Sequence, residues 1–293
     1  MNLGEKIKRL RAEKLMTQSQ LAGTVITRNM LSCIENGSAL PSLSTAKYLA
    51  QRLNVPLGYL LSDGEDEVLY NKNHMIADIK KAYCSGNLRI CRDMCLNSDC
   101  DKDDEICLII AECSFGIAVE DFECGMLRAA CAGFDEAIDM TSHTIYSTEH
   151  ILSSAAVYFR YMRRLSATLS SNLVDENNIE TYSSMTNDFC RYALALDALD
   201  GGSVAEAESF AGLGEAEDPL VLHMGAKLDM KKGDYASAYD KMHRTLTNGH
   251  SVSEPVMYDM FCDLEVCCRE IENFKGAYEY TNDKLELLQK MLT

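Results

Sequence analysis

The 293-residue sequence predicts an all-α protein made of two parts. Near its start, two short helices flank a tight turn, and each is preceded by a threonine. From residue 68 onward, amphipathic helices alternate with polar breaks and there is almost no strand signal. We therefore expect an N-terminal domain of five helices at residues 1–62 and a short acidic linker at residues 63–67. A tetratricopeptide-like (TPR-like), right-handed array of antiparallel helix pairs should follow at residues 68–293.

The two helices near the start are expected to begin at Gln18 and Arg28. Thr17 and Thr27 precede them, and a threonine hydroxyl in that position accepts a hydrogen bond from the unpaired N–H groups of the first turn. On the second helix, apolar residues recur on one side and polar residues on the other. The predicted core side carries Met30, Leu31 and Ile34, and the polar side carries Arg28, Asn29, Ser32, Cys33 and Asn36. The polar side is thus free to contact another molecule.

Residues 3–61 resemble the Cro/repressor-like (XRE-type) helix-turn-helix domain. The resemblance rests on Thr17-Gln18-Ser19-Gln20-Leu21-Ala22, on Ile34-Glu35-Asn36-Gly37 and on Pro41-Ser42-Leu43. It implies that the helix from Arg28 enters the major groove of an operator. Position by position, it implies base contacts from Arg28, Asn29, Ser32 and Cys33, with Ser32 also able to hold phosphate, and phosphate contacts from Gln18 and Asn36.

The chemistry of these side chains agrees with that assignment. Arginine can donate to both acceptors of guanine, and asparagine can bridge the acceptor and donor of adenine, each pair giving about 1–3 kcal/mol of discrimination. An amide at a helix N-terminus, as at Gln18, suits a phosphate. The alternative is that Arg28 and Asn29 are solvated residues on a small protein-binding bundle.

The charge is divided unevenly along the chain. The whole carries a formal net charge of −17. Residues 1–62 hold eight basic and three acidic residues, a net of +5, which leaves −22 for the rest. A basic module on an acidic body is typical of a protein that meets DNA with one end, since phosphate neutralisation supplies most non-specific affinity.

The sequence predicts a cytoplasmic protein without a membrane segment, metal or cofactor. No apolar run approaches the 18–20 or so residues needed to span a bilayer, and the first residues contain no apolar signal segment. The 13 cysteines include no Cys-x-x-Cys pair, and a cytosolic chain keeps its thiols reduced. Cys91 and Cys95 lie one helical turn apart, which leaves a redox sensor open as an alternative function.

The polar breaks beyond residue 68 are regularly spaced. They are Gly86-Asn87-Leu88, Glu120-Asp121-Phe122, Gly202-Ser203-Val204, Gly233-Asp234-Tyr235 and Glu272-Asn273-Phe274. If the longest interval is divided in two, the spacing is roughly 31 to 41 residues, which is typical of TPR-like helix pairs. Such arrays bury a continuous core and leave a concave face for an extended ligand.

Joined to this DNA-binding domain, the array is similar to the Rgg/PlcR-type regulators. That resemblance implies a transcription regulator that senses a short signalling peptide, as in quorum sensing, and forms a homodimer. No peptide-contact motif can be transferred residue by residue. The alternatives are a regulator whose repeats scaffold a protein partner and a thiol sensor that uses Cys91 and Cys95.

Candidate peptide contacts come from the side-chain chemistry. An extended peptide needs hydrogen-bond partners, side-chain pockets and a cation for its carboxylate. Aromatic and basic residues cluster around residues 158–164, and polar residues on later helices extend the set. The candidates are Tyr158, Arg160, Tyr161, Arg163, Arg164, Asn187, Arg191, His223 and Lys227. The alternative is that these arginines pair with acidic neighbours such as Asp175, Glu176 or Glu180.

Catalysis is not expected. The sequence contains no Gly-rich phosphate loop, Gly-x-Ser-x-Gly elbow or His-Glu-x-x-His helix. The six histidines are scattered, so none forms a recognisable site with its sequence neighbours.

Overall fold

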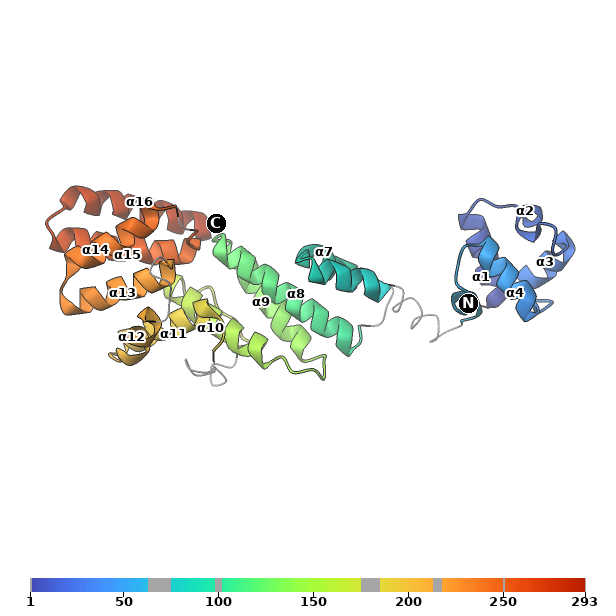
Figure 1. Ribbon diagram of the computed structural model, residues 1–293, viewed down its shortest axis with the longest axis horizontal. Helices are drawn as coiled ribbons and strands as arrows, with labels where there is room; N and C mark the ends of the chain where they lie inside the picture. The colour runs from blue at the N-terminus through green and yellow to red at the C-terminus, as the bar shows by residue number, and fades with distance from the viewer. Residues whose placement is uncertain are drawn as a thin grey trace. The chain divides into compact units, whose positions relative to one another are not determined.

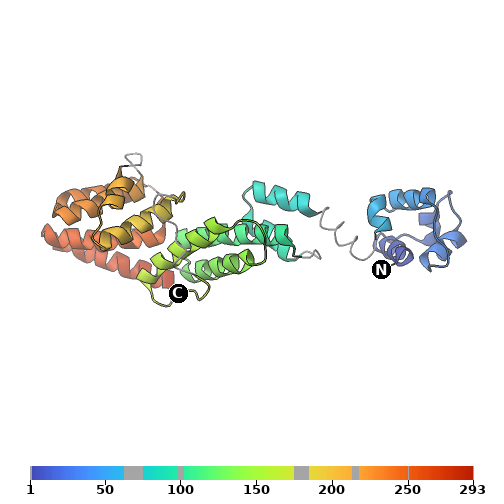
Figure 2. The same ribbon diagram turned by 90° about the horizontal axis from the view of Figure 1, so that it is seen from below.

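The computed structural model confirms an all-α chain (Figures 1 and 2). It describes residues 2–62, 75–97, 102–174, 185–212, 218–249 and 251–292, and every regular element in these ranges is a helix. Contacts between residues divide the chain into two compact units, residues 1–102 and 103–293. The expected linker at residues 63–67 lies outside the described residues, so that boundary stays a prediction. None of the described helices has the length and apolar character needed to cross a membrane.

Residues 2–62 form the five expected helices. They are α1 (Leu3–Glu13), α2 (Gln18–Ala22), α3 (Arg28–Glu35), α4 (Leu43–Arg52) and α5 (Leu57–Leu61). Both predicted threonine caps are confirmed. The Thr17 hydroxyl accepts from the backbone N–H of Gln20, whose side chain bonds back to the Thr17 N–H, and the Thr27 hydroxyl accepts from Met30.

The core of this domain joins all five helices. Its members are at most 9% exposed: Ile7, Leu10, Leu21, Ala22, Ile26, Leu31, Ile34, Leu49, Ala50, Leu53 and Leu60. Leu31 and Ile34 belong to it as predicted. The placement of Met30 in the core was wrong, because its side chain is 40% exposed. At 100° per residue, Met30 lies at the edge of the apolar side of α3, where side chains are partly exposed to solvent.

Helix pairs make up the rest of the described chain. Residues 75–84 are helical and are followed by α7 (Leu88–Leu96). The second unit contains α8 (Asp104–Glu123), α9 (Leu127–Thr141), α10 (Glu149–Leu165), α11 (Asp188–Asp200), α12 (Ala205–Ala211), α13 (Pro219–Lys232), α14 (Tyr235–Thr247), α15 (Glu254–Glu270) and α16 (Phe274–Leu292). Helices that are neighbours in sequence pack together, most extensively α8 with α9, α13 with α14 and α15 with α16.

One predicted break is misplaced. Residues 120–122 continue α8, and the chain turns instead at residues 124–126. Gly125 supplies the turn with a φ of +74°, a conformation that glycine adopts without steric cost. Asp121 lies within the helix at 6% exposure, so its charge did not mark a loop. The other four breaks fall between helices as predicted.

The last helix pair of the second unit packs against the first. α15 contacts α8, and α16 contacts α9. A Cβ at Gly125 would lie 2.3 Å from Glu254 Oε2 and 2.9 Å from Met291 Cγ, so this turn needs glycine for space as well as for conformation. The ion pair between Glu254 and Lys290 lies at the same junction. The last helix pair of the second unit is therefore anchored on its first pair.

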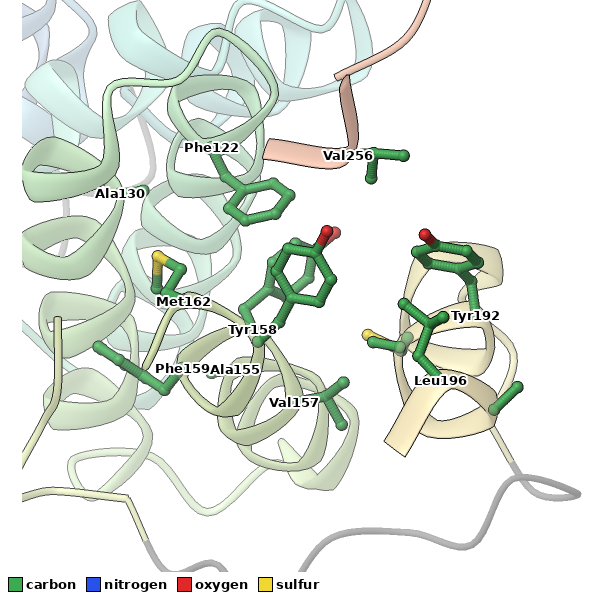
Figure 3. Packing of buried hydrophobic residues seen from close by; sticks show 14 of the residues in the cluster. Phe122, Ala130, Ala155, Val157, Tyr158, Phe159, Met162, Tyr192, Leu196 and Val256 are labelled. Atoms are coloured by element: carbon green, nitrogen blue, oxygen red, sulfur yellow. The ribbon is translucent and has the colours of Figure 1, made fainter. Parts of the chain in front are cut away.

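Aromatic side chains fill the interior of the second unit. Figure 3 shows Phe122 beside Tyr158, with Val256 to the right of Phe122 and Tyr192 on a separate helix. Val256 comes from α15, so the core joins the beginning and the end of the array. The four side chains are at most 2% exposed.

Candidate nucleic-acid interface and candidate ligand cavity

A buried carboxylate holds α3 in place. Glu35, 4% exposed, accepts from Arg11 of α1 through Nε at 2.6 Å and Nη2 at 3.0 Å, and from Gln18 Nε2 of α2 at 2.9 Å. Burial alone would raise the pKa of Glu35, but the bonds from Arg11 and Gln18 outweigh it and lower the pKa. A Cβ at Gly4 would lie 2.2 Å from the Ile34 carbonyl oxygen, so α1 meets α3 at a point where a side chain does not fit.

A second set of contacts fixes the turn between α2 and α3 against α4. Tyr48 Oη donates to the Ala22 carbonyl at 3.0 Å, and Arg52 Nη2 donates to the Gln20 carbonyl at 2.5 Å. Gly23, at a φ of +59°, leaves room for the Tyr48 hydroxyl to reach the Ala22 carbonyl. A Cβ on residue 23 would lie 2.3 Å from that hydroxyl. The orientation of α3 is thus set by α1, α2 and α4 together.

Four of the predicted DNA contacts on α3 and its C-cap face solvent. Arg28, Asn29, Cys33 and Asn36 are exposed, and Ser32 is half-buried on the same side. The first three residues of α3 are all exposed, whereas three of the remaining five are buried, so the first turn is the most accessible part of the helix. The assignment of each residue to a base or a phosphate stays a prediction.

Gln18 makes a contact that its predicted phosphate role did not include, and that role stays a prediction. It lies at the start of α2 as expected, but it is half-buried and its amide nitrogen donates to Glu35. This hydrogen bond joins α2 to α3. Sequence reasoning missed the central acceptor Glu35 and its partner Arg11, although Glu35 is part of the Ile34-Glu35-Asn36-Gly37 motif. The sequence did contain a signal for this contact: Glu35 is a lone acidic residue between the core residue Ile34 and the C-cap Asn36.

The arginines of α10 pair with aspartates of α11. Arg160 Nε lies 2.7 Å from Asp197 Oδ2, and Arg164 lies 3.1 Å from Asp200 Oδ2 and 3.8 Å from Asp197 Oδ1. The guanidinium of Arg164 also lies 5.7 Å from the ring centre of Tyr161. Acidic neighbours do neutralise these two arginines. Asp175, Glu176 and Glu180, which were named as partners from the sequence, lie outside the described residues.

Several other predicted ligand residues point into the interior. Tyr158 and Tyr161 are 2% exposed and His223 is fully buried. Tyr161 Oη donates to Asp259 Oδ2 at 2.6 Å. These three side chains therefore do not lie on an open surface. Neighbouring helices cover the side of α10 that carries Tyr158 and Tyr161, whereas Arg160 and Arg163 on its other side are exposed.

Polar bonds join α11, α13 and α15 inside the array. The Tyr192 hydroxyl and His223 Nδ1 are 2.6 Å apart, and His223 Nε2 lies 2.8 Å from Asp263 Oδ2. Lys227 Nζ lies 2.7 Å from the same oxygen. Burial would raise the pKa of Asp263, but Lys227 and His223 outweigh it and lower the pKa to about 2. His223 and Lys227 therefore share one acceptor, the Asp263 carboxylate.

The remaining predicted ligand residues have local roles. Asn187 caps α11 by accepting from the Cys190 N–H at 2.9 Å. Arg191 lies 3.7 Å from Asp188 on the same helix, and Arg163 is exposed on α10. The nine candidates are therefore not gathered on one surface.

A cavity of about 370 Å³ lies where α8 ends and α11, α13 and α15 begin. Phe122, Tyr158 and Phe189 form one wall, with ring centres 4.7 to 5.0 Å apart. Its lining is completed by Glu123, Cys124, Asp218, Pro219, Leu220, Ser251, Val252 and Ser253. Among the predicted ligand residues, Tyr158 alone lines this cavity. Burial first, and then Cys190 and Glu123, raise the pKa of the Tyr158 phenol.

Residues 4–65 match the family model described as "Helix-turn-helix domain". The chain is also 36% identical over 78 residues to the cryptic phage CTXphi transcriptional repressor RstR of Vibrio cholerae, an alignment that covers 25% of this chain and 70% of the repressor. The chain belongs to the helix-turn-helix family. It is a DNA-binding transcription regulator rather than an enzyme, as the sequence predicted.

Solved structures of other proteins align with most of the chain. One is PlcR of Bacillus thuringiensis in complex with the peptide PapR7 and DNA, at 15% identity, covering 98% of this chain and 95% of PlcR with a TM-score of 0.28. Another is the apo form of the competence regulator ComR of Streptococcus vestibularis, at 16% identity, covering 89% of this chain and 97% of ComR with a TM-score of 0.26. At these scores, no ligand or DNA contact is transferred from them to this chain.

The cysteine pair considered for redox sensing is inaccessible. Cys91 is fully buried and Cys95 is 1% exposed, and Cys91 Sγ lies 3.5 Å from the Ile79 carbonyl oxygen. Buried thiols react slowly because burial disfavours the thiolate. In this helix-turn-helix regulator, the pair packs α7 against residues 75–84.

Proposed function

We propose that the chain is a cytoplasmic, homodimeric regulator that reads an operator through α3 and responds to a short signalling peptide bound by its repeats. The DNA-reading part rests most firmly on one observation. The first turn of α3 exposes Arg28 and Asn29, while Leu31, Ile34 and Glu35 on the other side are buried. Two such helices about 34 Å apart would engage two half-sites one helical turn apart.

Base reading can be tested by comparing variants on specific and random DNA. Arg28→Ala and Asn29→Ala should each weaken binding to a selected operator by about 1–3 kcal/mol and leave binding to random duplex nearly unchanged. Lys47→Ala is the matched control, because Lys47 is an exposed basic residue on α4. It should weaken both DNAs alike or neither. Fluorescence anisotropy at fixed salt measures all three, and equal losses on both DNAs for Arg28→Ala would contradict the assignment.

The ligand-sensing part is supported by the aromatic-walled cavity in the second unit. At about 370 Å³ it is at the lower end of small-molecule pockets, so it would hold one or two residues of a peptide. Native mass spectrometry of the protein purified from its own cell should detect a small extra mass that denaturation removes. A synthetic peptide of that mass should then shift operator affinity. Unchanged affinity with that peptide would contradict this part of the proposal.

Dimerisation is supported by an exposed apolar stripe on α16. Phe274 and Tyr278 are each 69% exposed and Leu285 is 55% exposed, and their spacing places them on one side of the helix. Phe274→Asp with Tyr278→Asp should convert a dimer into a monomer in analytical ultracentrifugation. Tyr146→Asp is a control at another exposed aromatic residue, which should leave the dimer intact.

The alternative, a repeat array that scaffolds a protein partner, would use the same stripe. If the wild-type protein is a monomer that captures a second protein in stoichiometric amount, and the α16 variants lose that protein, this alternative replaces the dimer. Exposed apolar side chains in a row are typical of either kind of interface.

A further inference from the structure

The wall of the cavity in the second unit is a cluster of aromatic rings. Phe122 meets Tyr158 edge-on with ring centres 5.0 Å apart, and Tyr158 stacks on Phe189 at 4.7 Å with an interplanar angle of 21°. The rings come from α8, α10 and α11. Phe122 and Tyr158 are 1% and 2% exposed, so the accessible ring of this wall is mainly that of the half-buried Phe189. An aromatic ring offers apolar area and a negative π face, which attracts cations.

The charged groups on the cavity rim are both acidic. Glu123 is exposed at the C-terminal end of α8, where the helix dipole adds further negative potential. Asp218 Oδ1 accepts from the N–H groups of Leu220 at 2.8 Å and Val221 at 3.1 Å, so it caps α13. No basic residue is present among the described residues that line the cavity.

Nearby cations are already engaged with other carboxylates. Arg160 and Arg164 pair with Asp197 and Asp200, and Lys227 pairs with Asp263. None of them lines the cavity. The chain beyond residue 62 also carries a net charge of −22. An anionic group entering the cavity would meet two carboxylates and no basic side chain, with only the N-terminal dipoles of α13 and α15 in its favour. A cation would meet the two carboxylates and an aromatic wall.

We propose that this cavity binds a cationic, amphipathic end of the ligand: an ammonium or guanidinium group carried next to an apolar group, as in a peptide that begins or ends with a basic residue. The apolar group packs on Phe122, Tyr158 and Phe189, and the cation lies between Glu123 and Asp218. This proposal rests on the proposed ligand-sensing function and specifies the charge of its ligand. It reverses the expectation that arginines of α10 hold a peptide carboxylate.

Three small probes of nearly equal shape test the charge preference on the full-length protein. They are 2-phenylethylammonium, 2-phenylethanol and 3-phenylpropionate, which carry a positive charge, no charge and a negative charge. Titration followed by NMR of the probe should give an affinity for the ammonium about 5 to 10 times that for the alcohol, with the carboxylate weakest. Equal affinities, tighter binding of the alcohol or carboxylate, or no saturable binding of the ammonium would overturn the proposal.

Two conservative variants locate the charge preference. Glu123→Gln and Asp218→Asn should each weaken the ammonium about 3-fold, and together they should remove its advantage over the alcohol. Asparagine is as good a helix cap as aspartate, so Asp218→Asn keeps α13 capped. Asp234→Asn is the matched control, because Asp234 caps α14 in the same way but lies outside the cavity. An ammonium preference that survives the double variant would place the site elsewhere.

The two proposals can fail separately. If the ammonium is preferred in the way described but no peptide alters operator affinity, the cation site is real and peptide sensing is wrong. If a peptide alters operator affinity and competes with none of the probes, or is itself acidic, peptide sensing holds and the cation site is wrong.

Discussion

The candidate DNA contacts of α3 and three of the candidate ligand residues of the repeat unit are placed in opposite ways. On α3 the candidate DNA contacts face solvent, and a buried ion pair behind them holds the helix. In the repeat unit the candidate ligand residues Tyr161, His223 and Lys227 face inward and bond to aspartates of α15. The difference shows that a motif that fixes a helix's buried side also fixes which residues are exposed, whereas a repeat period does not.

The reason lies in the number of neighbours that each helix has. α3 has one buried side, so once Leu31 and Ile34 are in the core, the direction of every other side chain follows from 100° per residue. α10 packs against α8, α9 and α11 at once. Its residues Tyr158, Phe159, Tyr161 and Met162 are all buried although they point in different directions.

The largest effect is expected from the carboxylate that holds α3. Glu35→Gln removes the charge that accepts from Arg11 and Gln18, which leaves the half-enclosed Arg11 guanidinium without its counter-ion. Breaking a buried pair in this way costs about 3–5 kcal/mol. Urea unfolding should show this loss in the N-terminal transition, and operator and random DNA should both bind more weakly.

Glu13→Gln is the matched control for that prediction. Glu13 pairs with Arg9 at 3.5 Å, but both side chains are about half exposed. Surface pairs of this kind contribute about 0–1 kcal/mol. A loss in Glu35→Gln no larger than in Glu13→Gln would mean that the orientation of α3 is set elsewhere.

The next effect concerns the inward-facing network of the repeats. The pKa of Asp263 is lowered from the usual 3.8 to about 2, so its ionised form stabilises the folded state. That stability, about 2 kcal/mol, is present above pH 4 and is lost as the pH falls through about 2. Asp263→Asn should cost at least as much at pH 7, since Lys227 loses its partner, and should flatten the stability profile between pH 4 and 2.

Asp229→Asn gives a contrast at an ion pair between α13 and α14. Asp229 also accepts from a lysine, Lys241, at 2.5 Å, but that lysine is 30% exposed. A smaller loss at pH 7 is expected, because solvent screens the pair. If the two variants are destabilised equally, burial of the Asp263 network adds nothing to its strength.

A smaller effect separates two roles for Gln18. Its amide donates to Glu35, so Gln18→Ala should lower the free energy of unfolding of the N-terminal domain by about 1 kcal/mol and weaken all DNA sequences alike. Ser19→Ala, at an exposed position on the same helix, should change neither quantity. Weaker DNA binding without any change in stability would restore a direct phosphate contact.

Sequence reasoning succeeded where local chemistry decides structure. The caps at Thr17 and Thr27, the core positions Leu31 and Ile34, and the all-α class follow from side chains within one or two turns of each other. It failed at Met30 and at the break near residue 121, where the boundary between core and surface depends on packing partners. The packing of α15 and α16 against α8 and α9 joins segments more than a hundred residues apart, and no local pattern marks it.

The smallest direct effect is expected from Cys33, the exposed thiol on the candidate DNA-reading face. Cys33→Ser should change operator affinity by less than about 1 kcal/mol, because a hydroxyl replaces a thiol of similar size at a surface position.

Alkylating Cys33 with N-ethylmaleimide should abolish operator binding, because the added group would lie between α3 and the bases. Bound operator should protect the thiol, and Cys33→Ser should make binding resistant to the reagent. Cys84→Ser, at another exposed thiol, should leave the protein sensitive. If the protein alkylated at Cys33 binds operator normally, α3 does not enter the groove with this face. The outward-facing residues of α3 would then not be the DNA contacts, and the contrast with the inward-facing residues of the repeat unit would have no functional meaning.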